Sequence, residues 1–228
     1  MPCSNEVCGG YLMNLTNHVH THHIALVTGY AVVSYLIGCV STSYYVTKAH
    51  IGQDIRDLGS GNAGAQNVGK VLGRPWFFVI LLLDMLKGYV VVLGGIHLGL
   101  SSTVVTLGIV AVVSGHIWPV HMGFRGGMGI ATSLGAVLAF HWLVMAGIVG
   151  IFAATYFPQL WTGRTVARKA AARSAVAAIN LTALSMVLLK EPFMSWFSLI
   201  ILGFVHYAAY RSRLARGWPR PARDRAAA

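Results

Sequence analysis

Two glycine-rich segments carry the residue types best suited to binding a phosphate. Residues 59–73 read GSGNAGAQNVGKVLG, and residues 115–132 read GHIWPVHMGFRGGMGIAT. Glycine lets the backbone approach a ligand closely, so that N–H groups can point at an anion. A serine hydroxyl, two asparagine amides and a lysine add donors and a charge to the first segment. The candidate phosphate contacts in this segment are Ser60, Asn62, Gly64, Asn67 and Lys70.

The second segment combines a cation and several glycines with the start of an apolar run. Arg125, Gly126, Gly127 and Gly129 lead into a stretch without charged residues, where the free N–H groups of a helix start can hold an anion. His116 comes shortly before them. A histidine at a helix end is often only a structural hydrogen-bonding residue, but its closeness to an anion-type loop favours a catalytic role. The first segment also fits a tight turn between helices, and composition alone leaves both interpretations open.

The composition shows what kind of protein must position these loops. The 228 residues are 56% hydrophobic and 10% charged, and the mean hydropathy is +0.65. A chain so poor in charge is an integral membrane protein rather than a soluble domain. The excess of 17 Lys and Arg over 6 Asp and Glu does not indicate nucleic-acid binding, because the basic residues lie in short segments between apolar runs.

The apolar runs predict an all-α bundle of seven transmembrane helices. Residues 126–163 contain no Asp, Glu, Lys or Arg and are about twice as long as one span needs, so we expect two helices there that turn near Phe140–Met145. Asp84 and Lys87 stand at i and i+3 within the second run, and we expect them to form a structural ion pair that faces the bundle. The other expected spans are residues 24–47, 76–98, 103–122, 174–189 and 192–210.

The distribution of basic residues predicts the orientation of this bundle. If the first span runs from outside to inside, all basic residues except Lys87 and Lys190 lie in cytoplasmic segments, as the positive-inside rule requires. Both glycine-rich loops then face the cytoplasm, in a multi-pass protein of the inner (plasma) membrane with its N-terminus outside. Residues 1–23 form a His-rich extracytoplasmic extension, residues 24–210 the seven-helix domain, and residues 211–228 a basic cytoplasmic tail. The histidines and cysteines of the extension fit no standard metal spacing.

Four motifs resemble the bacterial acyl-phosphate:glycerol-3-phosphate acyltransferase family, a group of seven-span membrane enzymes. The resemblance runs from about Tyr35 to Gly217, and His206 and Arg213 match part of a third family motif at the end of the last span. The matching motifs are YLIG at Tyr35–Gly38, DIRDLGSGNAGAQN at Asp54–Asn67, DMLKG at Asp84–Gly88, and GHIWPVHMGFRGGMGIAT at Gly115–Thr132.

The resemblance implies a reaction and a set of roles. A fatty acyl group passes from acyl phosphate to the 1-hydroxyl of sn-glycerol-3-phosphate and gives lysophosphatidate for phospholipid biosynthesis, with no cofactor, no metal and no covalent intermediate. Ser60, Asn62, Asn67 and Lys70 would cradle phosphate, with Arg125 and the amides of Gly126 and Gly127 as the opposing wall. His116 would orient or polarise the acyl phosphate or the attacking hydroxyl, and His206 and Arg213 would close the site. The implied partners are these two substrates and membrane lipid, without nucleic acid.

Two alternatives remain open from the sequence. Met128 stands where the family places a lysine, which motivates a non-catalytic or weakened relative that binds or regulates anionic lipid precursors. A small-anion transporter fits less well, because the candidate anion groups cluster at one surface rather than along a path through the bundle.

Overall fold

The computed structural model describes residues 5–140, 142, 145–147, 149 and 150, with side chains from His22 onward. This part of the chain is helical and contains no strand, which agrees with the predicted all-α class. The helices are α1 (Asn5–Cys39), α2 (Thr42–Ile51), α3 (Ala65–Val71), α4 (Arg74–His97), α5 (Ser102–Ile117) and α6 (Ile130–Phe140), with two short 3₁₀ turns, η1 (Ile55–Asp57) and η2 (Val120–Met122).

Three stretches of the described chain are long and apolar enough to cross a membrane. They are His22–Ile51, Arg74–His97 and Ser102–Met122, and they coincide with the first three predicted spans. Half of the residues of the predicted turn near Phe140–Met145 lie outside the described part, and the described residues Trp142 and Met145 are helical. The predicted spans at 174–189 and 192–210 also lie outside it, so the count of seven remains a prediction.

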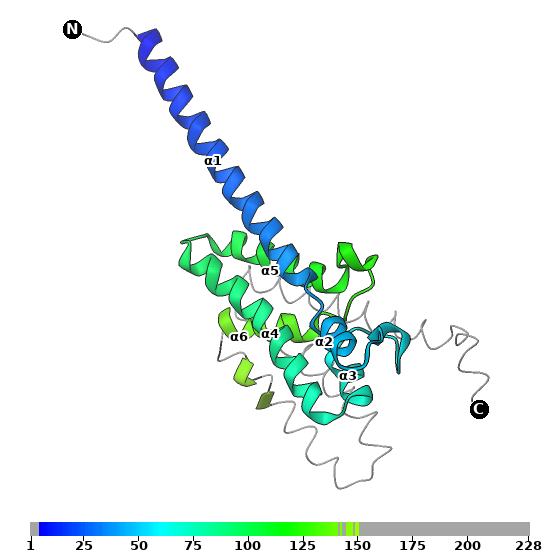
Figure 1. The fold of residues 1–228 in the computed structure, drawn as a ribbon. Helices are drawn as coiled ribbons and strands as arrows, with labels where there is room; N and C mark the ends of the chain where they lie inside the picture. Colours follow the sequence, from blue (N-terminus) through cyan, green and yellow to red (C-terminus); the bar gives the residue numbers. More distant parts are fainter. Residues whose placement is uncertain (1–4, 141, 143–144, 148, 151–228) are drawn as a thin grey trace.

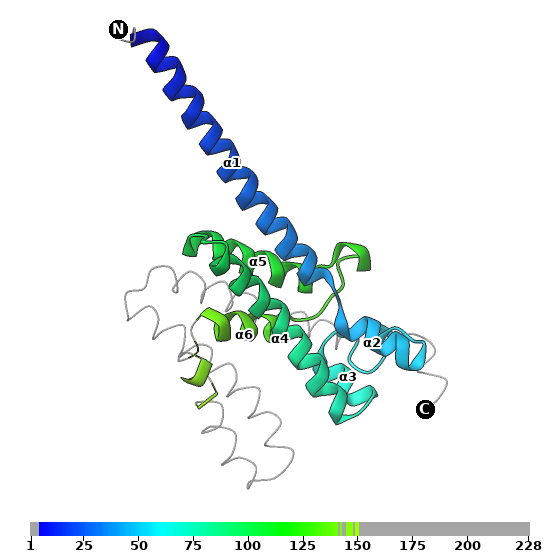
Figure 2. The same cartoon turned by 60° about the vertical axis from the view of Figure 1, so that its left-hand side comes forward.

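The helices are arranged so that both loops lie near one end of the bundle. Figures 1 and 2 show the N-terminal half of α1 standing clear of the other labelled helices, while its C-terminal end packs across α5. Next to this end, α2 and α3 lie beside the start of α4, and α6 packs along α4. The main apolar core lies between α4, α5 and α6 and is built largely of valine and isoleucine.

A second, smaller core anchors the first glycine-rich loop. Ile55, Ala63, Val68 and Ile80 are buried together, so the loop, α3 and α4 form one packed unit. Burial of such aliphatic side chains stabilises the fold by about 1.5–3 kcal/mol each. The loop is therefore fixed to the helices at both of its ends rather than suspended above them.

The first predicted span, residues 24–47, is not one continuous helix. The helix starts earlier, at Asn5, and α1 ends at Cys39. Ser41 adopts an extended conformation with φ −82° and ψ 91°, and α2 begins at Thr42. The break frees the carbonyl oxygen of Val40, which accepts a hydrogen bond of 2.6 Å from the ammonium group of Lys87. An interrupted membrane helix is tolerated where the freed backbone groups find partners inside the protein, which this bond supplies.

Glycine determines how closely α1 and α5 approach. A Cβ atom at Gly38 would collide with the carbonyl oxygen of Val112, and one at Gly115 would collide with the carbonyl oxygen of Tyr35. The two glycines face each other, because the Cβ position of Gly115 lies 3.1 Å from the Cα of Gly38. Small residues at a membrane helix crossing allow this backbone contact, and the crossing brings the end of α5 with His116 next to the break in α1.

Candidate active site

Asn67 organises the first glycine-rich loop. Its side-chain Nδ2 donates hydrogen bonds to the carbonyl oxygens of Ile55 and Leu58, at 3.0 and 2.9 Å, and its Oδ1 accepts the backbone N–H of Ser60 at 2.8 Å. The residue is fully buried. We expected Asn67 to contact phosphate directly, but both of its polar atoms are already bonded within the loop. In this structure Asn67 shapes the loop and offers no donor to a ligand.

Other candidates in the same loop are open to solvent. Ser60 and Lys70 are exposed, and Asn62 is half-buried. Within the described part of the chain, the Ser60 hydroxyl and the Lys70 ammonium group make no hydrogen bond. Gly64 precedes α3 in an extended conformation, and the Nδ2 atom of Asn62 lies against it, 2.8 Å from its Cβ position. A neutral hydroxyl, an amide and a cation are thus available on one loop.

The second loop folds back on the end of α5. The N–H of Gly126 donates to the carbonyl oxygen of Ile117, and the N–H of Gly127 donates to that of His116, both at 3.0 Å. We expected these two amides to face an anion, but the hydrogen bonds of the loop occupy them. Arg125 is exposed, and Gly129, with φ +77°, directly precedes the first residue of α6. Arg125 is therefore the group of this loop that is placed to meet a ligand.

The two loops meet at His116. A Cβ atom at Gly127 would collide with the Nε2 atom of His116 and would lie 2.7 Å from the carbonyl oxygen of Ala63 in the first loop. Glycine is required there because any side chain would separate the loops. His116 itself is buried, and its Nδ1 atom lies 3.7 Å from the Oδ1 atom of Asp84. The histidine thus stands between a buried carboxylate and the junction of the two loops.

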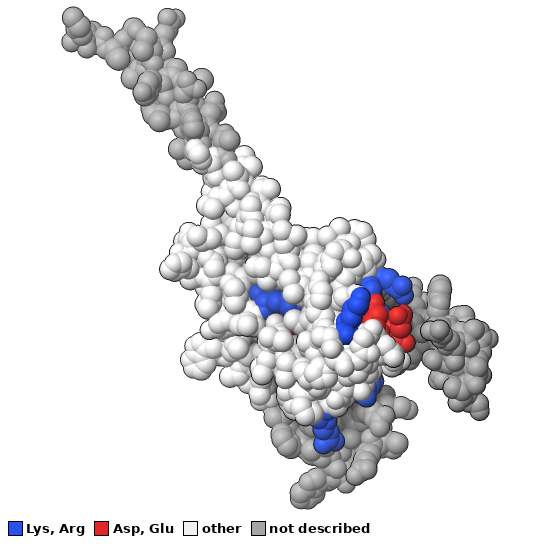
Figure 3. Space-filling view, viewed as in Figure 1, with Lys and Arg blue, Asp and Glu red and all other residues white. Residues whose placement is uncertain are grey.

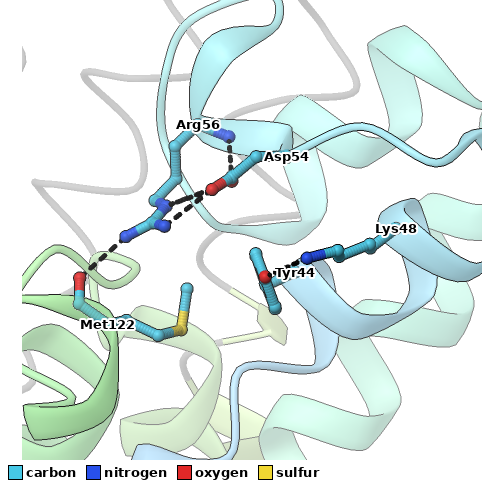
Figure 4. A network of polar contacts seen from close by, with 5 residues as sticks. All are labelled: Tyr44, Lys48, Asp54, Arg56 and Met122. Carbon is cyan, nitrogen blue, oxygen red and sulfur yellow. Dashed lines mark hydrogen bonds and ion pairs between the residues drawn. The ribbon is translucent and has the colours of Figure 1, made fainter.

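An ion pair that the sequence analysis did not single out connects η1, the turn before the first loop, to the second loop. Arg56 binds both carboxylate oxygens of Asp54 at 2.6–3.1 Å, and its Nη1 atom donates to the carbonyl oxygen of Met122 at 2.7 Å (Figure 4). Both side chains are 22% exposed. Tyr44 lies beside this pair, and the ammonium of Lys48 and the guanidinium of Arg56 lie 5.2 and 5.6 Å from its ring centre. The sequence did contain a signal for this ion pair, because an aspartate and an arginine stand two residues apart just before the first loop.

The charge of Asp54 is stabilised by this arrangement. Burial acts to raise its pKa, but the hydrogen bonds from the side chain and backbone of Arg56, together with its positive charge, outweigh burial and lower the pKa below the ordinary aspartate value. The same hydrogen bond raises the pKa of Arg56. The pair is thus ionised throughout the neutral range. In the view of Figure 3, charged side chains gather mainly at the end of the molecule where α2 and the first loop lie.

The remaining predictions about the site fall into two groups. Asp84 and Lys87 form the buried ion pair predicted from their spacing, with Nζ and Oδ1 2.6 Å apart. His206 and Arg213 lie outside the described residues. Among the side chains that the structure describes, no three His, Cys, Asp or Glu residues are grouped closely enough to hold a metal ion.

The described chain thus has the helices of an integral membrane protein and, at one end of the bundle, two packed glycine-rich loops with exposed cations. A family model described as glycerol-3-phosphate acyltransferase matches residues 28–218. Because this match covers most of the sequence, the chain belongs to the glycerol-3-phosphate acyltransferase family of membrane enzymes.

Individual relatives support the same assignment. The chain is 45% identical to a glycerol-3-phosphate acyltransferase 1 of Bacillus cereus over 127 residues, which are 56% of this chain and 70% of the relative. It is 49% identical to a glycerol-3-phosphate acyltransferase of Thermoanaerobacter sp. strain X514 over 108 residues, 47% of this chain and 54% of the relative. The fold is similar, with a TM-score of 0.70 and 29% identity, to the glycerol 3-phosphate form of PlsY, an integral membrane glycerol 3-phosphate acyltransferase, over 84% of this chain and 92% of that one.

Proposed function

We propose that this chain transfers a fatty acyl group from acyl phosphate to the 1-hydroxyl of sn-glycerol-3-phosphate and so forms lysophosphatidate for phospholipid biosynthesis. The observation that carries the proposal is the junction of the two loops at His116, where exposed Ser60, Lys70 and Arg125 lie on segments within the family match. Solved PlsY structures in a glycerol 3-phosphate form and a lysophosphatidic acid form share this fold and support both substrate and product class.

The proposed chemistry needs little more than positioning and charge. An acyl phosphate is already activated, so the protein must hold two anions near each other and stabilise charge on the departing phosphate. Ser60, Asn62 and Lys70 bind phosphate from one loop, with Gly64 allowing close approach, and Arg125 binds from the other, next to Gly129. Asn67, Gly126 and Gly127 act indirectly, by holding the loops in shape. His116 orients a substrate group at their junction, and His206 and Arg213 close the site from the last span.

We also propose the seven-span topology for this chain. Residues 24–210 form the bundle, with residues 1–23 outside, the basic residues 211–228 in the cytoplasm, and both glycine-rich loops on the cytoplasmic side of the inner membrane. Lys48 of α2, Arg56 of η1, Lys70 of α3 and Arg74 at the start of α4 all come between α1 and the apolar part of α4, and Arg125 comes between α5 and α6. These positions support the proposed orientation. No cofactor or metal takes part in the proposed reaction.

A turnover assay tests the function. Purified protein in detergent is given palmitoyl phosphate and labelled glycerol-3-phosphate, and we expect labelled lysophosphatidate and inorganic phosphate in equal amounts. A parallel assay with palmitoyl-CoA in place of palmitoyl phosphate shows which of the two compounds serves as acyl donor. Saturable binding of glycerol-3-phosphate without product would instead support the non-catalytic alternative motivated by Met128, and flux into proteoliposomes without acylation would support a transporter.

A further inference from the structure

A buried polar cluster lies beneath the junction of the two loops. It consists of Thr42 of α2, Asp84 and Lys87 of α4, and His116 of α5. The side chains of Asp84 and His116 are only 2% and 6% exposed. Charged and polar groups at such burial in a membrane protein are costly unless they are paired, and their presence indicates a role that offsets the cost.

The carboxylate of Asp84 is fixed in position from two sides. Its Oδ1 atom accepts hydrogen bonds from the hydroxyl of Thr42 and from the ammonium of Lys87, each at 2.6 Å. Lys87 is held in turn by the carbonyl oxygen of Val40 at the break between α1 and α2. These hydrogen bonds hold the Oδ1 atom in place, and the charge of Lys87 balances that of the carboxylate.

One ring nitrogen of His116, Nδ1, is on the side that faces this carboxylate. Its Nδ1 atom is buried and has no hydrogen-bond partner, and the nearest carboxylate oxygen is 3.7 Å away. That separation is about half an ångström beyond a hydrogen bond, and an unpaired buried nitrogen is unfavourable, so a small rotation of the ring would form the bond. The opposite nitrogen, Nε2, lies against Gly127, the residue of the second loop that the backbone of Ala63 in the first loop also approaches. The ring thus reaches from Asp84 to the place where the loops meet.

We propose that Asp84 is a positioning residue that selects one tautomer of His116. The carboxylate accepts the Nδ1 proton, which leaves the lone pair on Nε2 at the loop junction. A nitrogen that only accepts can bind the hydroxyl of glycerol-3-phosphate, which donates, whereas the oxygens of acyl phosphate cannot donate to it. This inference rests on the proposed function and refines it, because it assigns His116 to the attacking hydroxyl rather than to the acyl donor.

The first test reads the tautomer directly and does not depend on activity. The full-length protein is labelled with ¹⁵N-histidine, and the His116 signals are identified among the 10 histidines by their absence in His116→Gln. We expect the chemical shifts of a neutral ring protonated on Nδ1 in the wild type. In Asp84→Asn, an amide N–H can face Nδ1, so we expect a shift towards the form protonated on Nε2. A wild-type ring protonated on Nε2, or a tautomer that Asp84→Asn leaves unchanged, would overturn the proposal.

The second test is kinetic and separates positioning from general stability. Asp84→Asn should lower kcat about tenfold, the effect of losing one hydrogen bond to the attacking hydroxyl, while the KM for glycerol-3-phosphate changes by less than about threefold. In a His116→Gln background the same substitution should have almost no further effect on kcat. Equal losses in both backgrounds would show that Asp84 acts on folding alone. The matched control is Ser34→Ala, which removes a buried hydrogen bond of 2.7 Å within α1 and should leave kcat unchanged.

Asp84→Asn leaves Lys87 without its carboxylate and can therefore impair folding. The double variant Asp84→Asn/Lys87→Met removes both charges and keeps similar volumes, so it provides a folded form in which both tests are repeated. The same tautomer change and the same loss of kcat are expected. If the wild type shows no turnover, the proposed function fails, but the tautomer measurement still decides whether Asp84 positions His116.

Discussion

The buried side chain of Asn67 and the backbone N–H of Ser60 are joined by a hydrogen bond of 2.8 Å that spans the first glycine-rich loop. Two more hydrogen bonds tie the same amide to the carbonyl oxygens of Ile55 and Leu58. The position of the Ser60 hydroxyl therefore depends on a residue in α3 that a ligand need not touch.

Replacing Asn67 by aspartate tests this dependence. Asn67→Asp keeps the shape of the side chain but presents an acceptor to two carbonyl oxygens, and an unsatisfied buried group costs about 1–3 kcal/mol. We expect a lower Tm and a KM for glycerol-3-phosphate raised about tenfold. The control is Gln66→Glu, the same chemical change at the exposed neighbouring position, which should alter neither. Wild-type stability in Asn67→Asp would contradict the anchoring role.

The exposed cations of the two loops should be needed for phosphate binding. Loss of a hydrogen bond to a charged group costs about 1.5–3 kcal/mol, so Lys70→Ala and Arg125→Ala should each lower kcat/KM about tenfold to a hundredfold while the protein still folds. Arg74→Ala, which removes an exposed cation at the start of α4, controls for the general loss of charge. Unchanged kinetics in either loop variant would remove that residue from the site.

The crossing of α1 and α5 should not accept a side chain at Gly38. Gly38→Val places methyl groups against the backbone of α5 at Val112, and we expect a loss of about 1–3 kcal/mol or more in stability. The outcome is measured as the Tm in detergent. Gly29→Ala is the matched control in the same helix, because nothing lies within 4 Å of its Cβ position. If both variants melt alike, the close approach does not contribute to stability.

The ion pair of Asp54 and Arg56 predicts a pH dependence of stability. The pKa of Asp54 is lower in the folded protein than its ordinary value of 3.8, so the pair stabilises the fold above that value and the contribution is lost as the pH falls through the folded pKa. Asp54→Asn should therefore cost about 1 kcal/mol at pH 6, and the difference from the wild type should shrink below pH 3.8. Asp57→Asn, at an exposed neighbouring carboxylate, is the control. A difference that stays constant down to pH 3 would contradict the assignment.

The proposed topology predicts which side of the membrane each segment faces. In a background without Cys3, Cys8 and Cys39, a single cysteine in residues 59–73 or 164–173 should react with an impermeant thiol reagent only from the cytoplasmic side. A cysteine at position 5 should react only from outside. Labelling of both ends of the chain from one side would mean an even number of spans, and the interpretation of residues 126–163 as two helices would then be wrong.

The apolar pattern was sufficient to predict the membrane-length helices of the described residues, because a segment that crosses a bilayer must be apolar and must satisfy its own backbone as a helix. The runs at 76–98 and 103–122 correspond closely to α4 and α5. The break at Ser41 was not predictable from hydropathy, since Val40, Ser41 and Thr42 are uncharged and the partner of the freed Val40 carbonyl, Lys87, lies far along the chain. The ion pair of Asp84 and Lys87 was predictable because its spacing is local to one helix.

For the site, residue types indicated the chemistry but not how each group is used. Glycine and asparagine suit both an anion site and a self-bonded turn, and the structure uses Asn67, Gly126 and Gly127 in the second way. Ser60, Lys70 and Arg125 remain exposed. The hydrogen bond of Arg56 to Met122 joins segments that are distant in sequence. Motifs that are read one segment at a time do not predict such a contact.

The bond between Lys87 and the carbonyl oxygen of Val40 also has a consequence for biosynthesis. An isolated α4 would bring two charged side chains into hydrocarbon, at about 2.5–3.5 kcal/mol each. The groups that compensate these charges, the Val40 carbonyl and the Thr42 hydroxyl, belong to a segment that the ribosome completes earlier. The preceding helices therefore stabilise α4 in the bilayer, beyond what the pairing of Asp84 with Lys87 inside α4 achieves.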